Sequence, residues 1–71
     1  MANRSNNAYR RMTGRLRLNG HSAILETLEG GLFYLVTPDN LGGFDDRPVV
    51  VEGELSGQNR LLLTWIGIAG D

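Results

Sequence analysis

Cysteine and lysine are absent from the 71-residue chain, and histidine occurs only once. Without cysteine the chain can form no disulfide, no thiolate nucleophile and no cysteine-based zinc site. His21 alone is too few ligands for an ordinary metal cluster, so we expect neither a metal nor a cofactor. No apolar run is long enough to span a membrane, and the first residues show no secretory h-region. We therefore expect a cytoplasmic protein that does not bind membranes.

Hydrophobic residues are nevertheless plentiful, at 41% of the chain, which is too many for a disordered protein. A chain of this length can form one small domain and no more. Residues 1–9 are polar and show no periodicity, so we expect them to form a flexible N-terminal tail. The folded domain is expected over residues 10–71.

Charge is divided unevenly along the chain, although the formal net charge is only −1. Residues 1–17 carry five arginines and no acid, whereas residues 18–71 carry two arginines and eight acids. A guanidinium group suits phosphate oxygens, so this arginine-rich arm is a candidate contact for a polyanion. The more common use of such arginines, which we favour, is to pair with acids on neighbouring strands. The candidate residues of the arm are Arg10, Arg11, Arg15 and Arg17.

Alternation of polar and apolar residues predicts most of the strands. A period of two from Arg10 to Leu18 predicts a half-buried first strand. Asn19-Gly20 then predicts a hairpin turn of type I′, because both central positions of that turn need a positive φ. Further strands are predicted over residues 22–29, over residues 32–37, after Arg47-Pro48, and over residues 60–68.

One short helical turn is predicted between the third and fourth strands. Thr37 suits its cap, Pro38 its first position and Gly42 its exit. Five strands in so small a chain would leave open edges, which a closed barrel removes. The predicted fold class is therefore all-β, a small five-stranded OB-like barrel with this helical turn. Glycines within the strands favour strong curvature, and they are Gly14, Gly53 and Gly67.

Within such a barrel we expect the first and fourth strands to be antiparallel neighbours. Arg15 and Arg17 would then face outward beside Glu52 and Glu54, since all four lie on the polar faces of their strands.

Three short motifs carry a resemblance to a known family: Gly-Leu-Phe-Tyr-Leu-Val at 31–36, Leu-Gly-Gly-Phe at 41–44, and a Val-x-Val-x-Gly strand at 49–53. In this combination the chain resembles small bacterial OB-fold-like domains, a family without an assigned function. The resemblance spans roughly residues 13–68. It implies the OB-fold and a bacterial origin, and it implies no particular ligand.

OB-folds bind ligands on the face of strands 2 and 3 and on the loops between strands 1 and 2 and strands 4 and 5. His21 borders the first of these loops and Arg60 the second. Tyr34 lies on the third strand, where we expect it to face outward, since a hydroxyl tolerates water. An outward aromatic ring can stack on a nucleic-acid base, although Glu26 and Glu29 would repel phosphate. Single-stranded nucleic-acid binding by this face and the arginine arm is therefore the alternative function.

The third and fifth strands are apolar on both faces, which exceeds what one small barrel interior needs. Such an excess predicts self-association, with Phe33, Leu35, Trp65 and Ile66 as candidate interface residues. For Trp65 we favour the interior, and an outward ring would join the exposed strip. No constellation of catalytic groups is present, so we do not expect an enzyme. The function predicted first is a non-catalytic OB-like binding or protein-interaction module that forms a homo-oligomer.

Overall fold

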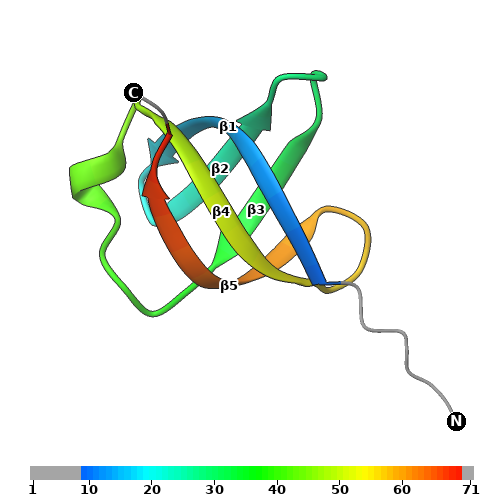
Figure 1. The fold of residues 1–71 in the computed structure, drawn as a ribbon. Helices are drawn as coiled ribbons and strands as arrows, with labels where there is room; N and C mark the ends of the chain where they lie inside the picture. The colour runs from blue at the N-terminus through cyan, green and yellow to red at the C-terminus, as the bar shows by residue number, and fades with distance from the viewer. Residues whose placement is uncertain (1–8, 70–71) are drawn as a thin grey trace, which may run out of the picture.

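Five strands and one short 3-10 turn are found in a computed structural model of the chain, which describes residues 9–69 (Figure 1). The elements in chain order are β1 (Tyr9–Asn19), β2 (Ser22–Thr27), β3 (Leu32–Val36), the 3-10 turn η2 (Gly42–Phe44), β4 (Pro48–Leu55) and β5 (Arg60–Ile68). The tail expected over residues 1–9 lies outside the described residues, except for Tyr9, with which β1 begins.

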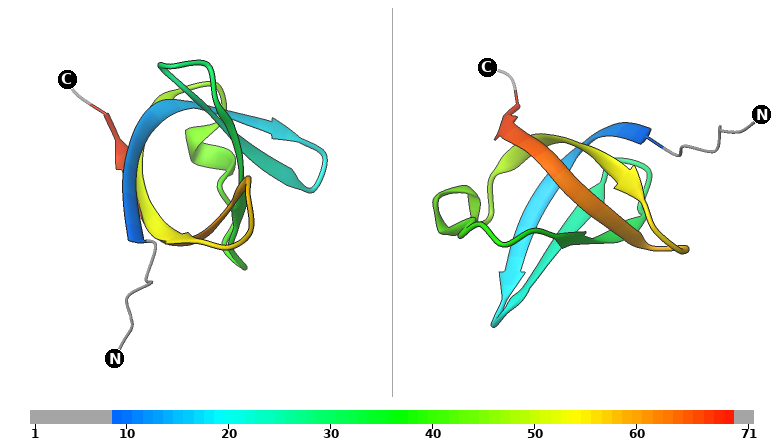
Figure 2. Two further views of the ribbon diagram at one scale, coloured as in Figure 1. Left: turned by 90° about the vertical axis from the view of Figure 1, so that its right-hand side faces the viewer. Right: turned by 90° about the horizontal axis from the view of Figure 1, so that it is seen from below.

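The strands form a closed barrel in the order β1-β2-β3-β5-β4, and β4 pairs again with β1 (Figure 2). Neighbouring strands are antiparallel except for β3 and β5, which are parallel. The long strand β1 closes the ring, because its residues 14–19 pair with β2 and its residues 9–15 pair with β4. The predicted fold class, an all-β five-stranded barrel with one helical turn between the third and fourth strands, is confirmed.

Two glycines allow the barrel wall to bend. A Cβ atom on Gly14 would overlap the backbone carbonyl of Glu26, and one on Gly53 would overlap the carbonyl of Leu62. Gly14 pairs with both β2 and β4, so it lies where β1 passes from one neighbour to the other. Both sites exclude a side chain, as expected where a strand bends sharply.

Inward-facing side chains fill the barrel, and the most buried are Leu16, Leu25, Leu35, Leu41, Val49, Val51 and Leu61. Leu35 and Phe33, which we named as candidate interface residues, face this interior. Leu35 is only 7% exposed, and Phe33 is partly buried against the core. The cause is their register, since they lie opposite the core-facing Ala23 and Leu25 of β2.

A β-bulge on β5 decides which way Trp65 points. The register between β4 and β5 shifts after Glu52, which pairs with Trp65, and Thr64 is skipped. One extra residue reverses the facing of every residue after it. Trp65, for which we favoured the interior, is therefore 50% exposed, whereas Ile66, expected in the exposed strip, packs against the core.

The turn between β1 and β2 is displaced by one residue from its predicted position. Asn19 pairs with Ser22, so the central residues are Gly20 and His21. Gly20 has a φ of 64° and His21 has no positive φ, which are the signs of a type II′ turn rather than type I′. His21 is therefore at the tip of the hairpin.

The helical turn also lies later than predicted, because η2 begins at Gly42, where the predicted turn ends. Thr37 instead forms a side-chain turn, in which its Oγ1 accepts a hydrogen bond of 3.1 Å from the backbone N of Asp39. The Oδ1 of Asn40 likewise accepts one of 2.8 Å from the N of Gly42. Two side-chain turns thus occupy the predicted helical residues, since such side chains compete with helix formation.

The predicted antiparallel pairing of the first and fourth strands is confirmed, but its register is different. Arg11, rather than Arg15 or Arg17, lies opposite Glu52. A shift by an even number of residues leaves the same side chains facing outward. The facing of the arginines was therefore predictable from the alternation, whereas their partners were not.

Candidate interaction surfaces

Large apolar side chains are exposed on the outer face of β3 and β5. Leu32, Tyr34 and Val36 alternate along β3 with the buried residues of that strand, and Leu62 lies beside them on β5. Their exposed fractions range from 39% to 51%. Val36 pairs directly with Leu62, so the four side chains form a continuous surface, which we name the apolar strip. Contiguous exposed apolar surface of this kind marks a site of association or ligand binding.

Two charges of opposite sign border the apolar strip. Arg60 pairs with Tyr34 across β3 and β5, and Glu54 pairs with Leu62 across β4 and β5. Both residues are exposed, and neither forms an ion pair with another residue in the range 9–69. The strip therefore has one unpaired cation and one unpaired anion at its borders.

Three of the predicted site residues line one hollow beside the strip. The hollow has a volume of about 450 Å³, and its walls include His21, Tyr34 and Arg60. They come from the β1–β2 turn, from β3 and from the start of β5, so the fold brings together residues that are distant in sequence. Tyr34 is half exposed, as we expected.

Asn59 is a residue of this region that the sequence did not single out. Its carbonyl accepts a hydrogen bond of 2.7 Å from the N of Tyr34, and its Nδ2 donates one of 3.0 Å to the carbonyl of Leu32. The loop between β4 and β5 is therefore attached to β3. The other members that were missed, Leu32, Val36 and Leu62, share the outward parity of Tyr34 and Arg60, so the alternation alone could have identified them.

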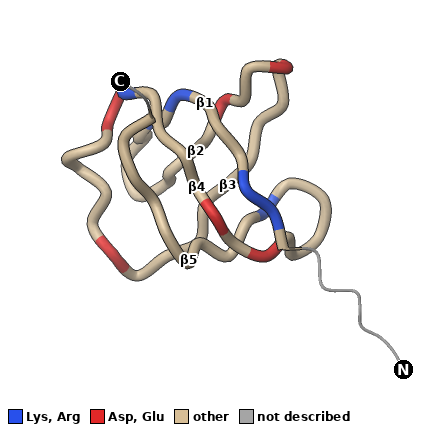
Figure 3. Tube along the Cα trace, in the orientation of Figure 1, with Lys and Arg blue, Asp and Glu red and all other residues tan. Residues whose placement is uncertain are grey.

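Three arginines of the arm are engaged with acids of the chain. Their ion pairs are Arg11 with Glu52 at 3.1 Å, Arg15 with Asp46 at 3.6 Å, and Arg17 with Glu26 at 3.3 Å. Basic and acidic segments accordingly lie side by side on β1 and β4 (Figure 3). Arg10 donates a hydrogen bond of 3.2 Å to the carbonyl of Tyr9. The pairing of these arginines with neighbouring acids is the use that we favoured from the sequence.

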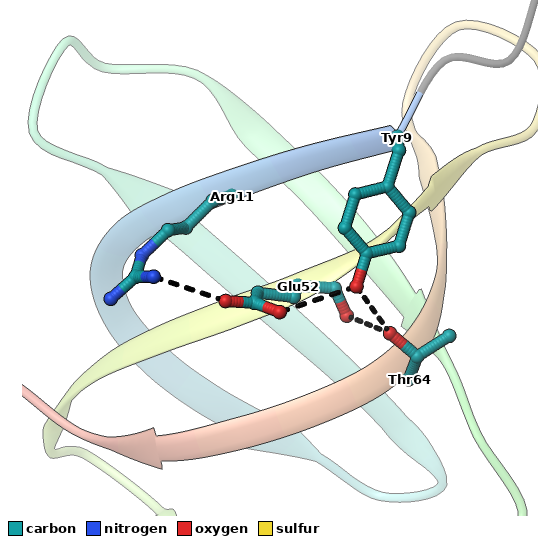
Figure 4. Close-up of polar contacts among 4 residues, drawn as sticks. All are labelled: Tyr9, Arg11, Glu52 and Thr64. Carbon is teal, nitrogen blue, oxygen red and sulfur yellow. Dashed lines mark hydrogen bonds and ion pairs between the residues drawn. The ribbon is translucent and has the colours of Figure 1, made fainter.

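A polar network covers the bulge on the outer face of β1, β4 and β5 (Figure 4). Glu52 is at its centre, because its carboxylate accepts hydrogen bonds from Arg11 at 3.1 Å and from the Tyr9 hydroxyl at 3.2 Å. Thr64, the residue skipped by the bulge, donates to the carbonyl of Glu52 at 3.0 Å and contacts the Tyr9 hydroxyl at 3.1 Å. Each polar group in this network has a partner within the chain.

Trp65 lies next to this network and has a structural contact of its own. A Cβ atom added to Gly67 would come within 2.6 Å of the indole ring, so the ring covers the backbone of that glycine. The ring therefore packs against its own strand on one side, and the side chain is half exposed.

Within the described part of the chain, no group of three or more His, Asp or Glu side chains could hold a metal ion. No helix of residues 9–69 is long and apolar enough to cross a membrane.

Comparison with known families gives one match. The model of a family described as a protein of unknown function (DUF5818) matches residues 13–69, which include all of β2 to β5 and most of β1. No curated protein and no solved structure matches the chain. A family without an assigned function agrees with what the sequence resemblance implied.

Proposed function

The chain belongs to DUF5818, a family of proteins of unknown function, and we propose that it is a non-catalytic interaction module with an OB-fold that self-associates through the apolar strip. The observation that carries this proposal is the exposure of four large apolar side chains on two neighbouring strands. Burial of such surface is the dominant favourable term in protein association. The absence of catalytic activity, the bacterial origin and the cytoplasmic location are parts of the same proposal.

A second copy of the chain is the occupant that the charges favour. In a twofold contact the same surface is used by both copies, so it must be complementary to itself. The strip meets this condition, because one cation and one anion flank it, Arg60 on β5 and Glu54 on β4 opposite Leu62. A twofold axis that passes between these two residues would bring Arg60 of one copy to Glu54 of the other, which fixes orientation as well as adding attraction.

The small size of the molecule limits the affinity of such a dimer to a weak or moderate value. A stable interface buries about 800 Å² on each partner, which is about a sixth of the 4637 Å² of accessible surface of this chain. The strip and its charged borders are a small part of a small barrel. We therefore expect a dimer that dissociates on dilution into the micromolar range.

Molecular mass at increasing concentration tests this proposal. The wild-type chain should form dimers as its concentration rises through the micromolar range. Leu62→Lys places a charge in the centre of the strip and should keep the chain monomeric over that range. Asn19→Lys, which also introduces a lysine but on the exposed face of β1 outside the strip and the hollows, is the matched control and should still dimerise. A wild-type chain that stays monomeric, or a Leu62→Lys variant that dimerises normally, would contradict the proposal.

The hollow beside the strip favours a second candidate, single-stranded nucleic-acid binding, because His21, Tyr34 and Arg60 meet there. Contact of four arm arginines with phosphates would give a salt slope of about −3. Three of these arginines would first have to leave the acids with which they pair. We therefore expect weak binding or none to a mixed oligonucleotide in a fluorescence anisotropy titration at physiological salt. Micromolar binding that Tyr34→Ala abolishes would favour this candidate over self-association.

A further inference from the structure

The barrel has another hollow, between the start of β1 and the β2–β3 turn. The pairing of β1 with β2 stops at Gly14 and Thr27, and beyond this point the start of β1 diverges from the β2–β3 turn. A hollow of about 330 Å³ lies between them. We name it the mouth, and its residues are Arg11, Met12, Thr13, Thr27, Leu28, Glu29 and Phe33. The left view of Figure 2 looks onto this side of the molecule.

Three apolar side chains, Met12, Leu28 and Phe33, form part of the lining of the mouth. Met12 and Phe33 lie in its walls, and both pack against the hydrophobic core on their inner sides. Leu28 stands beside them on the β2–β3 turn with 85% of its surface exposed, the largest fraction among the exposed large hydrophobic residues of the described chain. An apolar projection and an apolar hollow are thus neighbours on one surface.

The turn that carries Leu28 is held firmly. Thr27 accepts a hydrogen bond of 3.0 Å from the N of Gly30 and donates its own N to the carbonyl of Gly31 at 2.9 Å. Its Oγ1 also accepts one of 2.9 Å from the N of Gly31. Turns of this kind usually present polar residues to water. A leucine held in place on such a turn loses little conformational entropy when it is buried by a partner.

Charges of opposite sign face each other across the mouth. Glu29 lies beside Leu28 on the turn, whereas Arg11 lies on β1 at the other wall. Arg10 directly precedes Arg11 on the same strand, next to the lining of the hollow. Figure 3 shows the acidic segment at the tip of the β2–β3 turn and the basic segment at the start of β1. Among residues 9–69, neither Glu29 nor Arg10 forms an ion pair.

We propose that the mouth binds the mouth of a second copy of this chain. Leu28 of each copy inserts between Met12 and Phe33 of the other, and Glu29 of each copy meets Arg10 of the other. The twofold arrangement follows from where these residues lie. Leu28 and Glu29 are on the turn at one wall, and the arginines are on β1 at the opposite wall. A rotation by half a turn therefore places each feature against its complement.

This contact is separate from the apolar strip, so it goes beyond the proposed dimer. A chain with two different twofold surfaces can link dimers into tetramers or longer chains. The mouth is the smaller of the two surfaces in exposed apolar residues. Its assembly should therefore appear at higher concentration than the strip dimer, toward the millimolar range.

Sedimentation equilibrium of the full chain tests the proposal through four variants and one control variant. The wild type should exceed the dimer mass toward millimolar concentration, and Leu28→Asn should stop at the dimer. Glu29→Arg and Arg10→Glu should each weaken the mouth contact by about tenfold, because each places like charges together. The double variant Glu29→Arg/Arg10→Glu should recover the wild-type mass. Arg47→Glu, an exposed charge change outside the mouth, is the control and should behave as wild type.

The outcomes separate this proposal from the strip dimer. Leu28→Asn behaviour identical to wild type, or no recovery in the double variant, would overturn the mouth contact and leave the strip dimer standing. Recovery in the double variant supports a contact between copies, since a role within one chain would not be restored by exchanging charges that do not pair there. A wild-type dimer that Leu28→Asn abolishes and Leu62→Lys does not would support the mouth and contradict the strip.

Discussion

The wall formed by β1 and β4 and the wall formed by β3 and β5 belong to one barrel but have different outer surfaces. On the first wall Arg11, Glu52 and the Tyr9 hydroxyl are bonded to one another. On the second wall exposed apolar side chains lie beside two charges, Arg60 and Glu54, that form no ion pair within residues 9–69. The first wall is complete as a surface in water, whereas the second has apolar area and charge left for a partner.

Strand β4 shows this difference within three residues. Glu52 and Glu54 face outward on the same strand, and within residues 9–69 only the side chain of Glu52 has hydrogen-bonding partners. The register between β4 and β5 shifts between these two glutamates, directly after Glu52. The shift turns Trp65 of β5 outward, where its ring covers Gly67. The difference between the two outer surfaces therefore depends on local backbone geometry, which variants along β4 and β5 can probe.

The largest effect is expected where the bulge meets Gly53. Gly53→Ala would push a methyl group into the backbone carbonyl of Leu62, which cannot move aside as a side chain can. We expect a loss of about 3 kcal/mol of unfolding free energy, or about 15 °C in Tm. Thermal denaturation measures it, with Gly43→Ala as the control, because a Cβ at Gly43 meets nothing within 4 Å. An unchanged Tm for Gly53→Ala would show that β4 is not bent at this residue.

A smaller effect should separate the two glutamates. Glu52→Gln removes the charge that holds Arg11 and the Tyr9 hydroxyl, and should cost about 1 kcal/mol, less at high salt. Glu54→Gln should leave stability unchanged and instead weaken self-association. Chemical denaturation and concentration-dependent mass, measured on both variants, give the comparison directly. Equal losses of stability would mean that the two walls do not differ as described.

The smallest effect concerns Trp65. Gly67→Ala would displace the indole ring, but the ring is the end of a side chain and can swing outward. The loss of stability should be under about 1 kcal/mol. The ring should become more exposed, so its fluorescence emission should shift to longer wavelength. An unchanged emission maximum would show that the ring does not rest on Gly67.

Much of the fold was predictable because alternation and turn residues agree along most of the chain. The bounds of β5 were predicted as residues 60–68, and the outward facing of Tyr34 was predicted from its hydroxyl group, which tolerates water. The orientation of Trp65 was not predictable, since Leu62 to Ile66 is apolar on both parities and gives no sign of a bulge. The same ambiguity placed Leu35 and Ile66 in a surface strip, although they face the interior.

Which acid each arginine pairs with could also not be predicted from the sequence. Arg11, Arg15 and Arg17 all lie on the outward face of β1. Shifting β1 against β4 by two or four residues would therefore still place an arginine opposite an acid. The closure of the barrel selects one of them, because β1 must leave β4 at Gly14 to reach β2. That choice depends on the whole ring of strands and on no local motif.

The central claim, that the β3–β5 wall is covered by a second copy and the β1–β4 wall is not, is tested most directly by surface accessibility at two concentrations. Methyl relaxation by a soluble gadolinium probe can be recorded in dilute and in concentrated solution. The methyl groups of Leu32, Val36 and Leu62 should become protected at high concentration, while those of Val50 on the other wall stay unchanged. Equal accessibility of the Val36 and Leu62 methyl groups at both concentrations would contradict the account.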